Sequence, residues 1–201
     1  VIKPYELDIF VPSRNIAFEF NGLYWHSDNF VSDSNYHLNK LLACNEKGIK
    51  LIQIYEDEWT EKLDLVKAKI KHILKINQNL PKIQARKCEV REIDKDNANE
   101  YLERWHIQGR CGCTVALGCF HNEELIAVMT FKREHKDGDT WELTRFASAP
   151  SVVCQGCGGK LFKHFLRAYQ PSEVKSFADR RWTINKENNL YTKLGFELVR
   201  I

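Results

Sequence analysis

Residues 152–160 read VVCQGCGGK, a short apolar run that gives way to closely spaced glycines. The segment that follows, residues 159–169, is predicted to form a helix. Glycines ahead of a helix N-terminus leave backbone N–H groups exposed, and such groups suit a phosphate. The glycine-rich stretch is therefore the first candidate binding site in the chain.

The residues on both sides of this loop predict a mixed α/β domain. Asn122-Glu123 and residues 136–139 are turn sequences of hairpin type. Around them we predict strands over 82–93, 113–120, 124–133, 140–147, 173–179 and 196–201, and helices over 94–105, 159–169 and 187–194.

This order of elements, together with the glycine-rich loop and the late run LYTKLGF (190–196), is similar to the GNAT acyltransferase fold. The resemblance implies that a loop binds the coenzyme A pyrophosphate, and the matching residues here are Gln155, Gly156, Gly158 and Gly159. It also implies a general acid, for which Tyr191 is the matching position. Because folds are reused for unrelated functions, the resemblance predicts the fold and not acyl transfer. We expect coenzyme A to be an unlikely ligand, and DNA recognition to be the more natural role of this domain.

The N-terminal residues predict a β-hairpin with paired carboxylates. Two alternating runs, 5–11 and 16–22, flank a turn centred between residues 13 and 14, so that residues whose numbers sum to 27 pair. Asp8 then lies opposite Glu19, and the apolar side chains share the other face. Two carboxylates about 5 Å apart need a counter-charge, which Mg²⁺ or Mn²⁺ would supply. The alternative is a solvated sheet face with a basic side chain nearby.

Basic and imidazole side chains follow this hairpin. His26 comes soon after the second strand, and His37 and Lys40 share one face of a predicted helix that Gly48 ends. A third strand is predicted over residues 49–55. These groups strengthen the prediction of a metal site, because a histidine can move protons near neutral pH.

The runs ELDIFVPSRNIAFEFNGLYWHSD, YHLNKLLAC, GIKLIQIYEDEW and ARKCEVREI resemble phage-type homing endonucleases. Their Vsr-like nuclease domain is a variant of the PD-(D/E)xK restriction-endonuclease fold. The resemblance implies that Asp8 and Glu19 bind the metal, that Asn21 replaces the usual lysine, and that His26, His37 and Lys40 are catalytic candidates.

We therefore expect a metal-dependent DNA endonuclease that hydrolyses phosphodiester bonds, of a phage or mobile element, acting on double-stranded DNA in the host cytoplasm. A metal would activate water and offset the charge of the transition state. One alternative is a coenzyme A-dependent N-acyltransferase with an inactive nuclease-like module. Another is a DNA-binding protein without catalysis.

The charge is unevenly distributed. The total is +3, but residues 1–61 carry 5 Lys/Arg and 10 Asp/Glu, whereas residues 62–87 carry 8 Lys/Arg and one Asp. Lysines at i, i+4 and i+8 line one face of a basic helix, residues 62–75, which predicts phosphate contact; a solvated helix face is the alternative. The predicted DNA-binding residues are Lys67, Lys71, Lys75, Arg180 and Arg181, with a buried ion pair as the alternative for the two arginines.

The domains predicted from these patterns are 1–76, a linker at 77–84, and 85–201. Seven cysteines without an export signal indicate reduced thiols. Cys154-x-x-Cys157 and Cys111-x-Cys113, with Cys119, His106 and His121, offer zinc ligands, but the absence of a second CxxC at finger spacing disfavours a structural zinc. No membrane helix is expected. The first residue is Val1, which suggests that the chain is a fragment or a processed piece.

Overall fold

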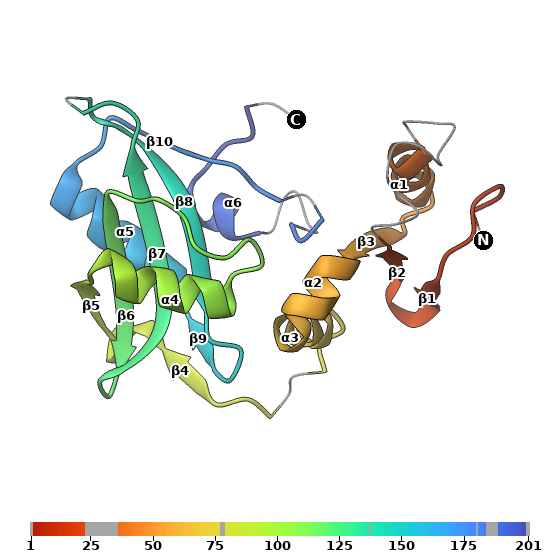
Figure 1. Cartoon of the computed structure of the whole chain (residues 1–201), viewed down its shortest axis with the longest axis horizontal. Helices are drawn as coiled ribbons and strands as arrows, with labels where there is room; N and C mark the ends of the chain where they lie inside the picture. Colours follow the sequence, from red (N-terminus) through yellow and green to blue (C-terminus); the bar gives the residue numbers. More distant parts are fainter. Residues whose placement is uncertain are drawn as a thin grey trace. The chain divides into compact units, whose positions relative to one another are not determined.

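The structure is a computed structural model that describes residues 2–22, 36–76, 79–136, 138–179, 181–183 and 189–199. The chain divides into two compact units (Figure 1). Unit 1 comprises residues 1–74 and 179–184, and unit 2 comprises residues 75–178 and 185–201. The predicted domain boundaries stay a prediction, and they do not anticipate that residues 179–184 group with unit 1.

Unit 1 contains a three-stranded sheet in the order β1-β2-β3. β1 (Ile9–Val11) pairs antiparallel with β2 (Ile16–Asn21), and β3 (Lys50–Tyr55) pairs parallel with β2. The short 3-10 helix η1 (Pro12–Arg14) forms the turn. The predicted register is confirmed, since Ile9 pairs with Phe18 and Val11 pairs with Ile16.

The predicted apolar face of this hairpin is buried at Ile16 and Phe18, but the predicted polar face is buried as well. Ala17 packs with residues of α1 (Tyr36–Glu46), so α1 covers the face that also carries Glu19 and Asn21. Both polar side chains are buried, whereas Phe20 on the other face is 47% exposed. β2 is the central strand, and helices therefore bury both of its faces rather than one. Trp59 of α2 (Glu56–Glu61), a helix the sequence did not predict, contacts Phe20 edge to face. The basic helix α3 (Leu63–Ile73) completes the unit.

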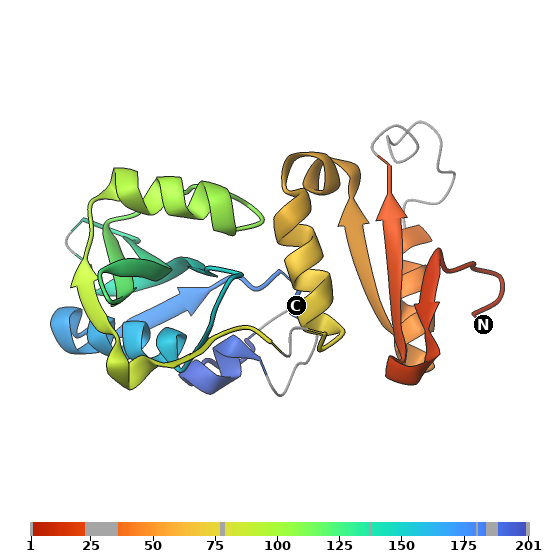
Figure 2. The ribbon, with the colours of Figure 1, turned by 90° about the horizontal axis from the view of Figure 1, so that it is seen from below.

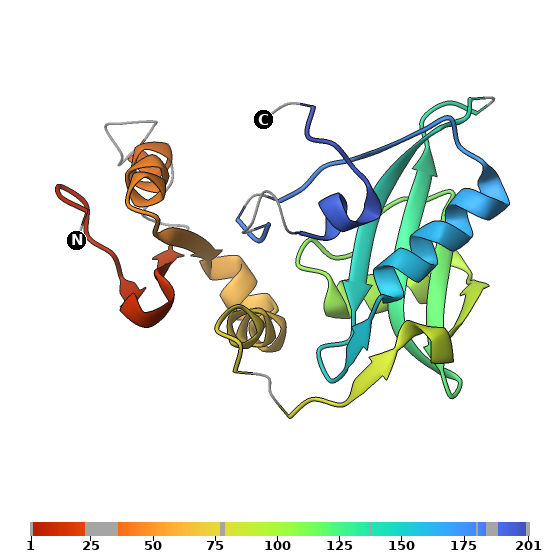
Figure 3. The ribbon, with the colours of Figure 1, turned by 180° about the vertical axis from the view of Figure 1, so that it is seen from behind.

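Unit 2 is built on a five-stranded sheet in the order β10-β8-β7-β6-β5. Its strands are β5 (Glu89–Glu92), β6 (Val115–His121), β7 (Glu124–Arg133), β8 (Thr140–Ser148) and β10 (Glu173–Ser176). All neighbours are antiparallel except β10 and β8, which are parallel. The helix α4 (Lys95–Trp105) covers one face and α5 (Cys157–Tyr169) the other, as Figures 2 and 3 show.

The face beneath α5 holds the main core of unit 2. Phe131 stacks on Phe165 with ring centroids 3.6 Å apart, and Trp141 meets Phe165 edge to face at 5.2 Å. All three side chains are at most 1% exposed. α5 is therefore fixed on the sheet by aromatic packing along its length, which also fixes the position of its N-terminus.

Four predicted strands differ in the structure, two of them only in length, since β1 and β10 are shorter than the predicted 5–11 and 173–179. The predicted strand 82–93 is interrupted by the 3-10 helix η2 (Ala85–Lys87), which leaves the short β4 (Lys82–Gln84) to pair parallel with β9 (Val153–Gln155). Residues 196–199 form no strand, and Val199 is 92% exposed, so an apolar run there lacks a partner sheet. Among the described residues, no helix has the length and apolar character needed to cross a membrane.

Candidate active site

The glycine-rich loop forms the N-terminus of α5. Gly156 is the N-cap residue and adopts φ +83°, a left-handed conformation that glycine reaches without strain. No side chain caps the helix. The first backbone N–H groups of an α-helix have no partner within the helix, and they attract an anion together with the helix dipole. The sequence thus leaves these donors available for a ligand.

Gly158 and Gly159, the two glycines inside α5, have different surroundings. A Cβ on Gly158 would lie 3.0 Å from Leu190 Cδ1 and 3.4 Å from Phe146, so this glycine permits close packing against α6 (Leu190–Leu194). A Cβ on Gly159 would meet no atom within 4 Å. The backbone at Gly159 is therefore open to an approaching group, whereas Gly158 fixes the start of the helix.

Basic side chains surround a cavity of about 690 Å³ beside this helix terminus. Four of its lining residues are cationic at neutral pH and one is acidic, which favours an anionic ligand. Lys160 is already engaged, because its ammonium group donates to the backbone carbonyls of Ala85 (2.9 Å) and Cys88. The charged lining residues are Arg86, Lys160, Lys163, Arg167 and Glu89, and the lining also includes Gly156 and Gly159.

Tyr191 lies in α6, next to the loop. Its neighbour Leu190 contacts the position of Gly158, and its own ring meets Phe196 edge to face at 6.0 Å. Asn189 caps the helix through its side chain, and Gly195 ends it in a left-handed conformation. These caps hold a five-residue helix that would otherwise be too short to be stable.

A β-bulge opens the sheet near this loop. Phe131 pairs with Leu143 but Thr130 pairs with Arg145, so Thr144 is the extra residue in β8. The last pair between β10 and β8 is Ser176 with Leu143, immediately before the bulge. Within the described residues, β8 therefore continues beyond the point at which its pairing with β10 ends. An opening of this kind leaves backbone groups available to a bound chain.

Side-chain hydroxyl groups and a thiol lie together at the bulge, between β7 and β8. The hydroxyl groups of Thr130 and Thr144 are 2.8 Å apart, and the sulfur of Cys111 lies 3.5 Å from each. Arg145 Nη1 donates to the carbonyl of Thr144 at 2.8 Å. The Nε of Arg145 is buried and has no hydrogen-bond partner in the part of the chain that the structure describes.

Of the predicted site residues of unit 1, Glu19 and Asn21 are buried on the face beneath α1, whereas Asp8 is exposed. Lys40 forms a buried ion pair with Glu19 Oε1, and Asp8 Oδ2 accepts from the backbone N–H of Phe20 at 2.8 Å. Glu19 Oε2 and both side-chain polar atoms of Asn21 are buried without a hydrogen-bond partner among the described residues. Gln53, which pairs with Glu19 across β2 and β3, is buried on the same face.

The remaining predicted residues of unit 1 fall into three groups. His26 and Arg180 lie outside the described residues. His37 is half-buried in α1, with its ring 5.5 Å from that of Tyr36. Lys67, Lys71 and Lys75 are exposed, so their contact with DNA stays a prediction.

Arg181 forms the ion pair that we considered as the alternative. It bonds Asp179 at 2.8 Å and Glu58 at 2.9 Å, and it stacks on Tyr55. Burial is the largest influence on its guanidinium, but the bonds to the two carboxylates outweigh it and raise its pKa. Nearby, Lys69 lies over the ring of Trp182, and burial lowers the pKa of that lysine.

Sequence reasoning missed several residues at these sites. Lys160 and the bulge at Thr144 belong to the loop region, and Gln53 belongs to the face of Glu19. Lys160 directly follows Gly159, so a cationic residue at the end of a glycine-rich loop was a signal in the sequence. The sequence does not indicate the bulge, because Thr144 and Arg145 fit the alternation of side chains expected of a regular strand.

Comparison with known proteins places unit 2 among acetyltransferases. The family described as "Acetyltransferase (GNAT) family" matches residues 78–196. A GNAT family acetyltransferase from Streptococcus pneumoniae TIGR4 is 17% identical, with 56% of this chain and 87% of that chain covered and a TM-score of 0.43. Aminoglycoside N-acetyltransferase AAC(6')-Iy, solved in complex with CoA, is 14% identical, with 57% and 90% covered and a TM-score of 0.42. Aminoglycoside acetyltransferase meta-AAC0020 from an uncultured soil metagenomic sample, solved with sisomicin, is 14% identical, with 47% and 80% covered and a TM-score of 0.37. A search of curated proteins finds no match.

These findings correct the predicted function. The mixed α/β fold with a GNAT domain is confirmed. The prediction of a DNA endonuclease that hydrolyses phosphodiester bonds is wrong, because the family match is to acetyltransferases and no comparison supports a Vsr-like nuclease. The prediction that coenzyme A is an unlikely ligand is also wrong, since GNAT acetyltransferases use acetyl-CoA. The motifs of the first unit led to both errors, because they were given more weight than the glycine-rich loop.

Proposed function

The chain belongs to the acetyltransferase (GNAT) family, and we propose that it transfers an acyl group from a coenzyme A thioester to an amine. The observation that carries this proposal is the uncapped N-terminus of α5, with Gly156 in a left-handed conformation and Gly159 open to approach. Such donors suit a pyrophosphate, and the N-cap residue Gly156 has no side chain that would compete for them.

The surrounding residues fit the same ligand. The cavity beside the loop has an excess of cationic side chains, which suits a molecule with several phosphates. The bulge at Thr144 ends the pairing of β8 with β10, and the extended arm of coenzyme A would lie along the strand backbone exposed there. The loop would thus hold the phosphates while β8 positions the thioester.

A coenzyme A thioester supplies an activated acyl carbon, to which an amine nitrogen bonds as the carbon–sulfur bond breaks. The leaving sulfur then needs a proton and the new amide must lose one. Tyr191 is the residue that we propose delivers the proton, on the basis of the resemblance of residues 190–196 and its place beside the loop. Phe196 orients the Tyr191 ring through an edge-to-face contact.

Release of the coenzyme A thiol tests the activity. The chain is incubated with acetyl-CoA and a panel of primary amines that includes an aminoglycoside, a lysine-containing peptide and a polyamine. We expect amine-dependent thiol release for at least one acceptor class, and a loss of about 10–100-fold in Tyr191→Phe with KM for acetyl-CoA retained. Thiol release that is equal with and without every amine would contradict acyl transfer to an amine.

A separate proposal concerns unit 1, whose relation to the PD-(D/E)xK fold rests on sequence resemblance. We propose that Asp8 and Glu19 bind a divalent cation. The support is the buried oxygen of Glu19 and the buried amide of Asn21, which have no hydrogen-bond partner among the described residues. Buried polar atoms without partners are costly, and a cation would compensate the carboxylate oxygen of Glu19 and the amide oxygen of Asn21.

Titration with Mn²⁺ tests this cation site, with water-proton relaxation as the readout. Asp8→Asn should weaken Mn²⁺ binding about tenfold or more. The matched control is Asp57→Asn, which neutralises an exposed carboxylate of α2 and should bind Mn²⁺ as the unaltered chain does. Equal Mn²⁺ affinity in the two variants would argue against the site.

A further inference from the structure

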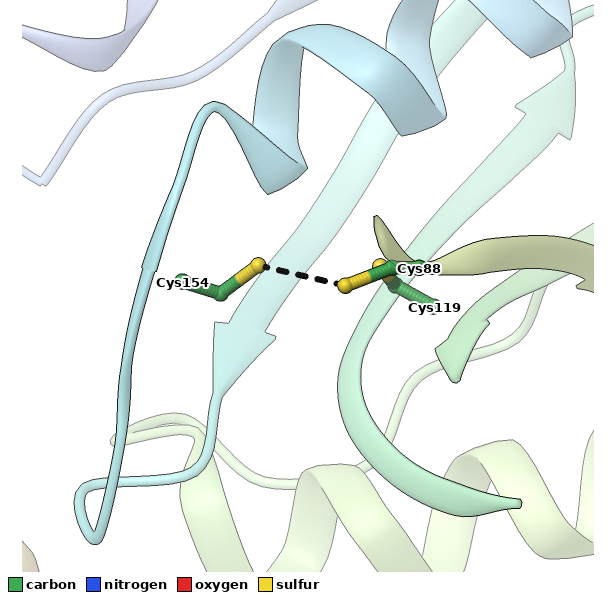
Figure 4. A group of neighbouring side chains, drawn as sticks. All are labelled: Cys88, Cys119 and Cys154. Atoms are coloured by element: carbon green, nitrogen blue, oxygen red, sulfur yellow. Dashed lines mark hydrogen bonds between the residues drawn. The ribbon is translucent and has the colours of Figure 1, made fainter. Parts of the chain in front are cut away.

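Three cysteine sulfurs from separate elements of unit 2 converge at one point. Cys88 follows η2, Cys119 lies in β6 and Cys154 lies in β9. Their sulfur atoms all lie within 4.8 Å of one another, and Figure 4 shows the sulfur of Cys154 directed toward the other two. We refer to Cys88, Cys119 and Cys154 as the thiol cluster.

The spacing of the thiol cluster fits a metal better than a disulfide. The sulfurs of Cys88 and Cys154 are 3.8 Å apart. A tetrahedral zinc with Zn–S bonds of about 2.3 Å separates its sulfurs by about 3.8 Å. A disulfide needs about 2.05 Å between its sulfurs, so oxidation would require the backbone or side chains to move. All cysteines among the described residues are free thiols.

The candidate fourth ligand is Cys157, three residues after Cys154, whose sulfur lies outside the three that are within 4.8 Å of one another and would have to move toward them. Cys157 is the first residue of α5 and is 5% exposed, and its side chain interacts with that of Cys154. The spacing C-x-x-C is the usual one for a pair of ligands in structural zinc sites. From the sequence, Cys119, Cys154 and Cys157 were candidate zinc ligands, but Cys88 was not, because only the fold brings it close to the others.

The surroundings of the thiol cluster also suit a thiolate-bound cation. Zinc with four thiolates carries a net charge of −2, which a neighbouring cation would offset. Lys160 provides that charge, because its ammonium group is held on the carbonyl oxygens of Ala85 and Cys88.

A catalytic role for these thiols is less consistent with their environment. Burial first, and then the neighbouring thiols, raise the pKa of Cys119 to about 12. Burial likewise raises the pKa of Cys154 and of Cys157. A nucleophilic cysteine needs the opposite shift, toward the thiolate at neutral pH.

We propose that Cys88, Cys119, Cys154 and Cys157 bind one structural zinc ion in the acetyltransferase domain. Cys154 and Cys157 flank Gln155 and Gly156, so the ion would tie the glycine-rich loop to β6 and to the segment after η2. The site would fix the start of α5 independently of any ligand in the cavity. It does not depend on the proposed transfer activity.

Metal analysis of the purified chain, with any histidine tag removed, tests the proposal. We expect about one equivalent of zinc after dialysis, and a small fraction of that in Cys154→Ser. Cys111→Ser is the matched control, since Cys111 is also half-buried in unit 2 but lies outside the cluster, and it should retain the zinc. Circular dichroism verifies that each variant is folded.

Substitution with Co²⁺ gives a readout that does not depend on stability. Thiolate-to-cobalt charge-transfer bands and intense visible bands of a tetrahedral site are expected in the unaltered chain and in Cys111→Ser, and they should be lost in Cys119→Ser. Equal zinc content in Cys154→Ser and the unaltered chain would overturn the proposal. A zinc-free chain would also overturn it, and a mass lower by two hydrogens per chain would then indicate a Cys88–Cys154 disulfide.

Discussion

Gly159 is the position at which the proposed phosphate site can be altered with least risk to the fold. It is the third residue of α5, and a side chain there would enter open space. Glutamate is favoured at this helical position because its charge complements the helix dipole. Gly159→Glu should therefore leave the protein as stable as before or slightly more stable, while it places a negative charge beside the uncapped N–H groups.

The size of the effect follows from the charge. A carboxylate about 6 Å from a phosphate, at an effective dielectric constant of about 20, costs close to 3 kcal/mol, or about 100-fold in affinity. Full solvation would reduce this to below about 1 kcal/mol, or a few-fold. We expect coenzyme A to bind about 5–100-fold more weakly to Gly159→Glu.

Gly159→Ala is the control for this experiment. Its methyl group meets no atom within 4 Å and it removes backbone freedom, so it should stabilise α5 by about 0.5–1 kcal/mol and leave the affinity within about threefold. Isothermal titration gives both affinities, and thermal unfolding gives the stabilities. If Gly159→Glu binds coenzyme A as tightly as Gly159→Ala, the phosphates do not bind at the N-terminus of α5.

The remaining predictions concern charge and packing. In buffer free of divalent cations, Lys40→Met leaves Glu19 buried without a counter-charge and should cost about 3–5 kcal/mol in urea unfolding, most of which the double variant with Glu19→Leu should restore. A double variant no more stable than the single one would refute the pairing. Phe165→Ala removes the ring stacked on the sheet and should cost about 3–5 kcal/mol, seen as a lower Tm, and an unchanged Tm would contradict the assigned core. Lys163→Gln combined with Arg167→Gln should weaken coenzyme A binding about 3–30-fold and make the affinity less dependent on salt. An unchanged salt dependence would show that the basic cavity does not bind the phosphates of coenzyme A.

Local patterns in the sequence predicted most of the elements. The strand 124–133 has the predicted bounds, and the hairpin register at Ile9 and Phe18 is the predicted one. Both follow from alternation and turn residues, which act over a few positions. Asn122 and Glu123 both adopt positive φ, as a tight hairpin turn requires.

Features that depend on distant contacts could not be predicted in this way. The side of β2 that α1 covers is decided by packing, so Glu19 and Asn21 are buried although alternation placed them on the polar face. The convergence of Cys88 on Cys154, which are 66 residues apart in the chain, depends on the pairing of β4 with β9. Nothing in either segment alone indicates that pairing.

The predicted function failed for a related reason. The paired carboxylates and the glycine-rich loop were both visible in the sequence, and each pointed to a phosphate-containing ligand of a different kind. Charge and residue spacing could not decide which of the two proposed sites determines the function. The reason is that tertiary packing shapes both the face beneath α1 and the N-terminus of α5. The family match over residues 78–196 decides in favour of an acetyltransferase over a DNA endonuclease.

Calorimetric titration of the chain with acetyl-CoA, without an acceptor, tests the central claim most directly. We predict saturable binding at one site with a Kd of about 1–100 μM. At 100-fold excess over Kd, this binding should stabilise the fold by about 2.7 kcal/mol and raise the Tm. The absence of both binding heat and a Tm shift at millimolar acetyl-CoA would contradict the account.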